Sequence, residues 1–365
     1  MNGGEHSILA VLQHLAGHTL EPTILAPESG KLWEFCRTQG WRCCPLNLSE
    51  LARSPDQFTN QLKSIIAEHQ IELLHANSLS AGRKLGAVAS RLPCPTSTHL
   101  RDILSLSNSA ISSLNEHAGM IAVSHATRDF HLAQGLDSTR STVIYNGIDT
   151  AIFSPRPATG WLHRELGLDW KGSGQSPILA GIVGQICLRK GHLDAAAAAV
   201  MMKDRFPALH FVLVGERHST KAESVEFDQQ ITRTFVEAGI PDRLHRVGWR
   251  EGMETLYLEL QLLIHPARQE PLGRVLLEAA ACGVPVVSTH VGGTPEIFTS
   301  GESAWLVPPS NPPALAEGIE RLLTEQELSQ QFVQSALNVI QNRFTIPLSA
   351  TNHLQFWTRL TGKEI

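Results

Sequence analysis

Two glutamates beside a predicted helix start form the most informative group of polar residues in the sequence. Glu270 lies between an apolar run that ends at His265 and a helical pattern that begins near Gly273, and Glu278 lies inside that pattern. The first turn of a helix offers unpaired backbone N–H groups and a positive dipole end, which suit a phosphate. Glu270 can accept sugar hydroxyls or stabilise developing positive charge, and Glu278 can hold a ribose diol. The alternative is an ordinary α/β unit in which Glu270 merely caps the helix.

These residues must be positioned by strands and helices that alternate along the chain. Apolar runs separated by helical patterns of ten to fifteen residues predict βαβ units and a parallel sheet, so we expect an α/β fold. The predicted strands are 23–26, 71–76, 96–99, 120–124, 142–145, 178–186, 210–214, 243–247, 262–265, 284–288 and 304–307. The predicted helices are 7–18, 32–39, 57–69, 82–91, 195–205, 223–238, 253–260, 274–281, 314–323 and 347–360, and residues 105–115 are predicted as a polar loop.

Turn-rich segments divide the chain into two predicted domains. The predicted boundaries give a first domain of residues 1–155, a connection of 156–176 and a second domain of 177–346, with 347–365 returning to the first. Ligands of open parallel sheets bind beyond the carboxyl ends of the strands. We therefore expect the functional site in a cleft between two facing sheets.

Composition excludes several classes of protein. Of the 365 residues, 42% are hydrophobic and 18% are charged, with a net charge of −5, so neither a disordered protein nor a basic nucleic-acid binder is expected. The six cysteines include no Cys-x-x-Cys pair, which argues against a zinc site or a disulfide framework. The sequence shows no signal peptide and no apolar run long enough to span a bilayer, and we expect a cytoplasmic protein.

Four segments together resemble glycosyltransferase family 4, the retaining enzymes of the GT-B fold. Residues 264–287 resemble the family's Glu-x7-Glu signature, and residues 181–191 resemble its phosphate-binding strand and loop. Residues 143–155 and 288–296 resemble the segment that closes the first domain and the loop after a later strand. The resemblance covers nearly the whole chain and is most specific in residues 143–310. Residues 294–296 are also a good helix start by themselves, and that alternative stays open.

The resemblance implies two doubly wound, Rossmann-like domains with parallel sheets and a C-terminal helix that returns to the first domain. It also implies a retaining front-face transfer from a nucleotide-sugar donor on the second domain to an acceptor on the first, with no cofactor and no metal. A Lys190 ammonium can neutralise a leaving diphosphate, although a solvated surface lysine is the alternative. The implied donor-binding residues are Gly3, Gly4, Gly184, Arg189, Lys190, Leu272, Gly273 and Glu278.

Histidine side chains carry the implied chemistry of the first domain. The resemblance assigns His99, expected at the end of a strand or just after it, and Glu270 as the catalytic residues that contact the transferred sugar. His75 and Asn77 resemble a position near the acceptor. A structural role is the alternative for each histidine.

Two departures from the family pattern keep other functions open. Gln185 stands where the family has an arginine, and the strand that should precede the Gly3-Gly4 loop is missing. A GT-B nucleotide-sugar epimerase and a catalytically weakened nucleotide-sugar-binding protein are therefore the alternatives. The expected acceptor is a carbohydrate, a lipid-linked molecule or a small molecule, and no basic amphipathic helix supports contact with a membrane.

Overall fold

The computed structural model describes residues 3–16, 20–49, 54–170 and 176–363, which form two compact units. Unit 1 comprises residues 1–147 and 344–365, and unit 2 comprises 148–343. The boundary thus lies after Gly147 rather than after residue 155, and the predicted connection belongs to unit 2. Glu259 holds the connection to unit 2, because its buried carboxylate accepts hydrogen bonds from the backbone N–H groups of Thr159 (2.8 Å) and Gly160 (3.1 Å). Residues 171–175 of that connection lie outside the described chain.

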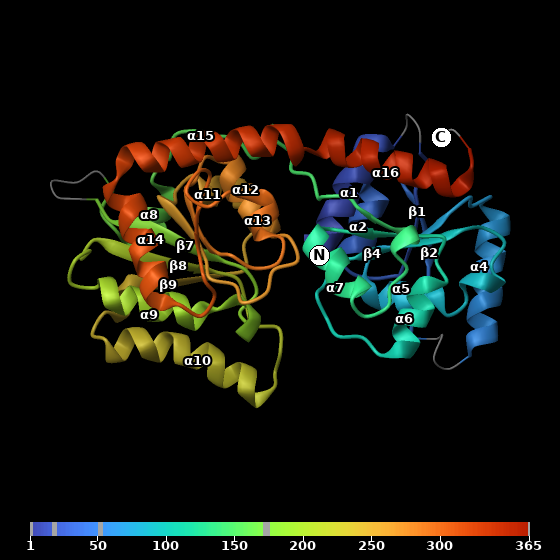
Figure 1. Cartoon of the computed structure of the whole chain (residues 1–365), viewed down its shortest axis with the longest axis horizontal. Helices are drawn as coiled ribbons and strands as arrows, with labels where there is room; N and C mark the ends of the chain where they lie inside the picture. The colour runs from blue at the N-terminus through green and yellow to red at the C-terminus, as the bar shows by residue number, and fades with distance from the viewer. Residues whose placement is uncertain (1–2, 17–19, 50–53, 171–175, 364–365) are drawn as a thin grey trace. The chain divides into compact units, whose positions relative to one another are not determined.

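Unit 1 contains short parallel strands separated by helices (Figure 1). Its strands are β1 (Thr23–Ala26), β2 (Arg42–Pro45), β3 (Leu74–Ala76), β4 (Thr96–Leu100), β5 (Gly119–Ala122) and β6 (Ser141–Val143). Its helices are α1 (Gly3–Leu15), α2 (Lys31–Thr38), α4 (Pro55–Glu68), α5 (Leu79–Gly86), α6 (Asn108–Asn115), α7 (His125–Leu132) and α16 (Ile346–Thr361), with 3-10 turns η1 (Ala89–Arg91) and η2 (Ser138–Arg140).

The strands of unit 1 form two separate sheets. In the described part of the chain β1 pairs only with β2, whereas β3, β4, β5 and β6 form one four-stranded sheet in that order. Numbered from 2, these strands have the orders 3-2 and 4-5-6-7, which match the doubly wound order 3-2-1-4-5-6 with one additional strand and with no strand 1 among the described residues. The first described element is α1, so the described chain contains no strand at that position.

The last helix packs on the first one. Apolar side chains of α1, among them Ile8 and Val11, share a buried cluster with Phe356 and Trp357 of α16 and with Ile121 of β5. α16 starts where the Thr345 side chain accepts a hydrogen bond from the Leu348 backbone, and it ends at Gly362. The prediction that the C-terminal helix returns to the first domain is confirmed.

Unit 2 is a doubly wound domain around a six-stranded parallel sheet (Figure 1). Its strands are β7 (Ile178–Val183), β8 (Leu209–Val214), β9 (Leu244–Gly248), β10 (Leu262–His265), β11 (Val286–Thr289) and β12 (Trp305–Val307). Its helices are α8 (Trp161–Glu165), α9 (His192–Met202), α10 (Ala222–Glu237), α11 (Met253–Tyr257), α12 (Arg274–Ala281), α13 (Thr294–Ile297), α14 (Pro312–Thr324) and α15 (Gln326–Arg343), with η3 (Leu188–Lys190) and η4 (Pro241–Arg243).

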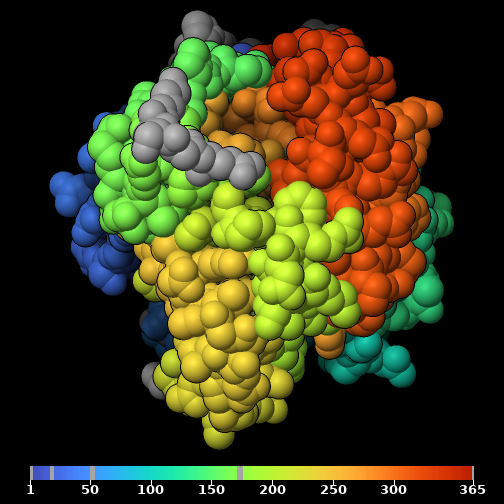
Figure 2. All heavy atoms as spheres, turned by 90° about the vertical axis from the view of Figure 1, so that its left-hand side faces the viewer, coloured from blue at the N-terminus to red at the C-terminus, as the bar shows by residue number. Residues whose placement is uncertain are grey.

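One continuous core lies between this sheet and the helices α9, α10 and α14. It contains the alanines of α9, Phe227 and Phe235 of α10, and inward residues of the central strands such as Phe211 and Ile264. Helices α10 and α14 pack against α9, and its alanines belong to the core against the sheet, which explains why its sequence is apolar on almost every side. The outer side of α10 is exposed and appears yellow in Figure 2.

Several elements differ from the sequence-based expectation. Residues 108–115, predicted as part of a polar loop, form α6, because Ser107 caps the helix by accepting a hydrogen bond from the Ala110 N–H (3.3 Å). β2 and the long helix α15 were not predicted. Gly3 and Gly4, expected in a loop, form the first turn of α1.

Candidate active site

The order of the strands of unit 2 indicates that its site lies at the carboxyl ends of the two central strands. The order is β12-β11-β10-β7-β8-β9, so the strands after β7 are added on one side of it and those from β10 onward on the other, and the strand order reverses between β7 and β10. Ligands of doubly wound sheets bind beyond the carboxyl ends of the strands at such a switch point. Lys190 follows β7 and Glu270 follows β10, so both residues lie at this reversal.

Lys190, Glu270 and His265 meet on a single oxygen atom. The Lys190 Nζ lies 2.5 Å from the Glu270 Oε2, and the His265 Nε2 lies 2.8 Å from the same oxygen. All three side chains are largely buried, with 12%, 7% and 2% of their side-chain areas exposed for Lys190, Glu270 and His265. The structure therefore brings together two residues predicted from the sequence and adds His265, which was not predicted.

This arrangement keeps Glu270 ionised. Burial alone would raise the pKa of the Glu270 carboxyl, but the Lys190 ammonium and the His265 hydrogen bond outweigh it and hold that pKa well below its usual range. Burial and the Lys190 charge lower the pKa of His265, against the opposing effect of Glu270. His265 is therefore neutral, and because an ionised carboxylate only accepts hydrogen bonds, its proton lies on Nε2.

The loops that carry Lys190 and Glu270 are joined through their backbones. The Arg189 carbonyl accepts hydrogen bonds from the N–H groups of Arg268 (2.8 Å) and Gln269 (3.4 Å). The Arg268 side chain forms two hydrogen bonds with the Asp194 carboxylate, which follows the Lys190 loop. The Arg189 side chain is exposed.

Helix α12 carries the second glutamate of the motif. The helix begins after Gly273, which has φ +108°, and both Gly273 and the preceding Leu272 are buried. The Arg274 Nε donates to the Glu278 Oε1 (2.6 Å), and the Tyr257 hydroxyl donates to the Glu278 Oε2 (3.0 Å). Burial and the neighbouring Glu278 raise the pKa of Tyr257 well above its usual value, so its proton stays available for this bond.

Two glycines bring the loop after β11 against the Glu270 loop. The Gly293 N–H donates to the Glu270 carbonyl at 2.9 Å. Gly292 has φ +52°, and a Cβ placed there would lie 1.9 Å from the Glu270 carbonyl oxygen. Only glycine fits this backbone conformation and this close approach. Gly184 plays a smaller part, since its Cβ position lies 3.7 Å from the Lys190 Cε.

The predicted histidines of unit 1 lie together beneath α16. The His75 Nδ1 is 2.9 Å from the Ser97 Oγ, and the His75 Nε2 is 3.1 Å from the His99 Nδ1. His99 was expected at the end of its strand or just after it, but β4 continues to Leu100, and His99 lies inside the strand and is completely buried. Residues of α16, which joins from the far end of the sequence, cover it; the His353 ring is centred 5.3 Å away.

Asn77 and Arg101 directly follow β3 and β4 at the carboxyl edge of the unit 1 sheet. The Arg101 Nη2 donates to the Asn77 Oδ1 (2.7 Å), and its Nη1 donates to the Asn146 Oδ1 (3.0 Å). The same Nη2 lies 3.2 Å from the His99 Nδ1, which must therefore accept and leave the His99 proton on Nε2. The Asn77 amide donates to the Gly4 carbonyl (3.0 Å), so the start of α1 also lies at this edge.

We expect the buried histidines of unit 1 to make it sensitive to acid. Burial, followed by repulsion from neighbouring histidines and Arg101, lowers the pKa of His75 and His99 well below 6.5, and burial lowers that of His353 to about 4. In the unfolded chain these histidines take up protons below about pH 6.5, whereas in the folded unit His353 does so only near pH 4, and His75 and His99 also only well below 6.5. Stability should therefore fall as the pH decreases through this window, and His353 alone contributes about 2 kcal/mol of this loss at pH 5.

Hydrogen exchange of residues 346–361 at pH 7 and pH 5 measures this loss locally. His353→Gln removes one titrating ring and should reduce the difference between the two pH values. His14→Gln, at an exposed position of α1, is the matched control. Equal pH dependence in wild type and His353→Gln would contradict the prediction.

Several residues that form hydrogen bonds with the predicted site residues were not predicted from the sequence. Arg274 stands four positions before Glu278, a spacing at which helical side chains meet, so this pair was detectable. His265 ends a predicted strand five residues before Glu270. Tyr257 and Arg101 approach their partners only through the fold, and no local pattern indicated them.

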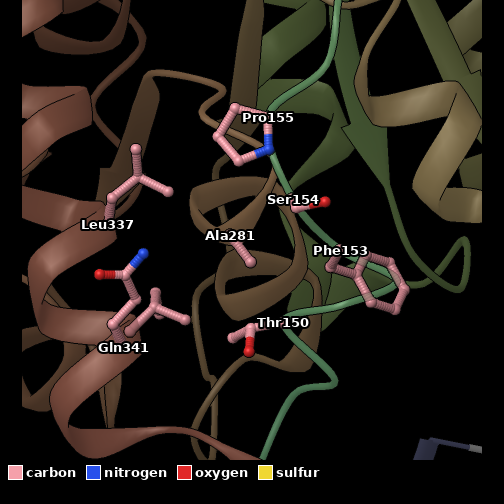
Figure 3. A pocket seen from close by; sticks show the side chains of 8 residues that line it. Thr150, Phe153, Ser154, Pro155, Ala281, Leu337 and Gln341 are labelled. Carbon is pink, nitrogen blue, oxygen red and sulfur yellow. The ribbon is translucent and has the colours of Figure 1, made fainter.

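A separate small pocket of unit 2 contains none of the predicted residues (Figure 3). Its volume is about 220 Å³ with its open mouth, and its lining residues are Thr150, Phe153, Ser154, Pro155, Ala281, Leu337, Ile340 and Gln341. Within the described residues, no group of three or more His, Cys, Asp or Glu side chains could hold a metal ion. None of the described helices has the length and apolar character needed to cross a membrane.

Two family models match the chain, one in each half. The model of "Glycosyltransferase Family 4" matches residues 1–152, and that of "Glycosyl transferases group 1" matches residues 171–339. The second match contains Lys190, Glu270 and Glu278.

Curated relatives carry glycosyltransferase names. The D-inositol 3-phosphate glycosyltransferase of Corynebacterium jeikeium is 26% identical, over 84% of this chain and 70% of the relative. The lipopolysaccharide core mannosyltransferase LpcC of Rhizobium leguminosarum is 27% identical, over 58% of this chain and 57% of the relative. The chain thus spans only about half to two thirds of the length of such relatives.

Solved structures share the fold over nearly the whole chain. HepE of Anabaena in complex with UDP matches with a TM-score of 0.85 at 20% identity, covering 98% of this chain and 97% of HepE. The sucrose-phosphate synthase of Thermosynechococcus elongatus matches with a TM-score of 0.75 at 18% identity, covering 94% and 100%. The two parallel-sheet domains, the matched family models and the Glu-x7-Glu motif at the switch point agree, and the chain is a group 1 glycosyltransferase of family 4 with the GT-B fold.

Proposed function

We propose that the protein transfers a sugar, with retention of anomeric configuration, from a nucleotide-diphosphate sugar to an acceptor hydroxyl. The observation that carries the proposal is the buried Lys190–Glu270 pair at the switch point of unit 2, directly before the start of α12. A cation, a helix start and a carboxylate at one strand edge suit the diphosphate and the sugar of such a donor. HepE, a protein of the same fold, has been crystallised with UDP and with UDP-glucose.

The donor groups follow from the contacts within unit 2. Lys190, the exposed Arg189 and the backbone of Leu272 and Gly273 bind the diphosphate. Glu278, already held by Arg274 and Tyr257, takes the ribose hydroxyls. Glu270 has its Oε2 occupied and offers its other oxygen to the sugar. Arg189 provides the cation that Gln185 cannot supply.

The acceptor groups belong to unit 1. Asn77 and Arg101 follow their strands at the carboxyl edge and are half-buried, which suits contact with hydroxyl groups. His75 and the completely buried His99 lie behind them, and His99 accepts a hydrogen bond from Arg101. We therefore assign the two histidines to orienting Arg101, and with it the acceptor, which is a carbohydrate, lipid-linked or small molecule.

A thermal-shift screen against UDP, GDP, ADP, CDP and their sugars tests the proposal. A nucleotide diphosphate that stabilises the native protein raises Tm through mass action, and a response to one base fixes the donor class. Product analysis with the responding sugar then distinguishes transfer from epimerisation, and NMR of the product gives the anomer. If no nucleotide diphosphate raises Tm, the proposal is wrong; if one binds without any transfer, the protein is a nucleotide-sugar-binding protein instead.

We expect Gly292→Ala to reduce turnover by about tenfold or more, because displacing a catalytic carboxylate by a fraction of an ångström weakens preorganised contacts. The new Cβ would collide with the Glu270 carbonyl and shift its loop. Gly301→Ala is the matched control, since Gly301 also has a positive φ (+80°) but no atom within 4 Å of its Cβ position. Steady-state kinetics with the identified donor measures both variants. Equal losses in the two would contradict a role for the Gly292 contact.

We also propose that the diphosphate charge is met by side chains and the helix start, without a metal ion. Turnover should then be unchanged after dialysis against EDTA, measured with the donor identified by the screen. A loss of activity that Mg²⁺ or Mn²⁺ restores would contradict this assignment.

A further inference from the structure

One carboxylate oxygen of Glu270 accepts hydrogen bonds from two side chains, and in the proposed function one of these side chains must bind the donor diphosphate instead. Lys190 and His265 both donate to the Glu270 Oε2, at 2.5 and 2.8 Å. In the proposed donor complex the Lys190 ammonium binds the diphosphate. A buried carboxylate that loses its only counter-charge is strongly disfavoured, so another group must hold the Oε2 at that moment.

We propose that His265 is the positioning residue that keeps Glu270 in place when the donor diphosphate takes Lys190. Its Nε2–H stays on the Oε2, so that the Oε1 remains directed to the transferred sugar. Within the described residues, the Glu270 Oε1 receives no hydrogen bond, whereas the Oε2 accepts two. This inference rests on the proposed function and adds to it a residue with no direct contact to the substrate.

The place of His265 is fixed by the sheet rather than by a loop. It is the last residue of β10 and lies in register with Ser288 of β11. Its carbonyl accepts hydrogen bonds from the Ser288 Oγ (3.2 Å) and the Thr289 Oγ1 (3.4 Å), and its ring is buried. Lys190, in contrast, ends a short 3-10 turn and has a long flexible side chain. The histidine is thus the stationary partner and the lysine the partner that can move.

Two substitutions separate positioning from simple packing. His265→Leu fills the space but removes the N–H donor, whereas His265→Gln retains a donor on a side chain of similar reach. We expect His265→Leu to lower kcat by about 10²-fold with little change in the donor KM, as for a misplaced catalytic group. His265→Gln should keep most of the wild-type kcat. His210→Gln, at the opposite end of the sheet, is the control and should behave as wild type.

The pH profile is a second readout that a packing role would not change. The His265 hydrogen bond favours ionised Glu270, so its removal should move the acid limb of kcat to higher pH. The Tm increase caused by the nucleotide diphosphate should stay the same in His265→Leu, because Lys190 is intact.

Three results would overturn the inference. They are wild-type kcat and pH profile in His265→Leu, failure of His265→Gln to restore kcat at normal Tm, and loss of the nucleotide-dependent Tm increase in His265→Leu. The proposed function fails separately, when the wild-type protein itself neither binds a nucleotide diphosphate nor releases one from any nucleotide sugar.

Discussion

Lys190→Ala should lower the turnover of a nucleotide sugar by at least about 10²-fold, the scale on which preorganised electrostatic groups act. The ammonium is the buried positive charge of the switch point, and we assign it to the leaving diphosphate. Its loss removes stabilisation of the charge that develops on the leaving group. It also leaves the buried Glu270 carboxylate with only the neutral His265 as a partner, which raises the pKa of Glu270.

Measurement of kcat and KM, with Tm as a check of folding, tests this expectation. Lys203→Ala is the matched control, because Lys203 is half-buried in unit 2 and, among the residues that the structure describes, its Nζ donates only to the Ala238 carbonyl (3.2 Å). Lys190→Arg keeps the charge but changes its shape and should retain more activity than alanine. Wild-type turnover in Lys190→Ala would remove Lys190 from the donor site.

The strands that position the site of unit 2 were predictable from sequence because they are buried on both faces. β10 was predicted at its observed bounds, and β7 and β8 within a few residues, since continuous apolar runs between helical patterns have few other interpretations. The loops after them were also predictable, which is why Lys190 and Glu270 were both identified. The direct contact between Lys190 and Glu270 was not predictable, because it depends on the order of the strands in the sheet, and local sequence patterns do not specify that order.

Unit 1 was harder to predict for the same physical reason. His99 was predicted at the end of a strand or just after it, in contact with the transferred sugar, yet β4 continues past it and α16, more than two hundred residues later in the sequence, covers it. The three-residue strand β3 gives only a weak periodic signal, and the partner of Asn77 is a backbone carbonyl of α1. Packing between segments far apart in the sequence determines whether these side chains are exposed, and local secondary-structure propensity does not predict it.

Glu270→Gln should also lower turnover by at least about 10²-fold, because the amide keeps the shape of the side chain but not its charge. The buried pair allows a test that separates catalysis from stability. Glu270→Gln alone leaves the Lys190 ammonium buried without its counter-charge, and Lys190→Met alone leaves the carboxylate. Each single variant should therefore lose stability.

The double variant Lys190→Met/Glu270→Gln removes both charges together. Replacement of a whole buried ion pair by neutral groups is often close to neutral for folding, so its Tm should exceed that of either single variant. Its turnover should stay as low as in the single variants, since the buried ammonium for the diphosphate and the carboxylate for the sugar are both absent. Recovery of turnover together with Tm would mean that the pair only supports the fold, and that the chemistry of the switch point lies in other residues.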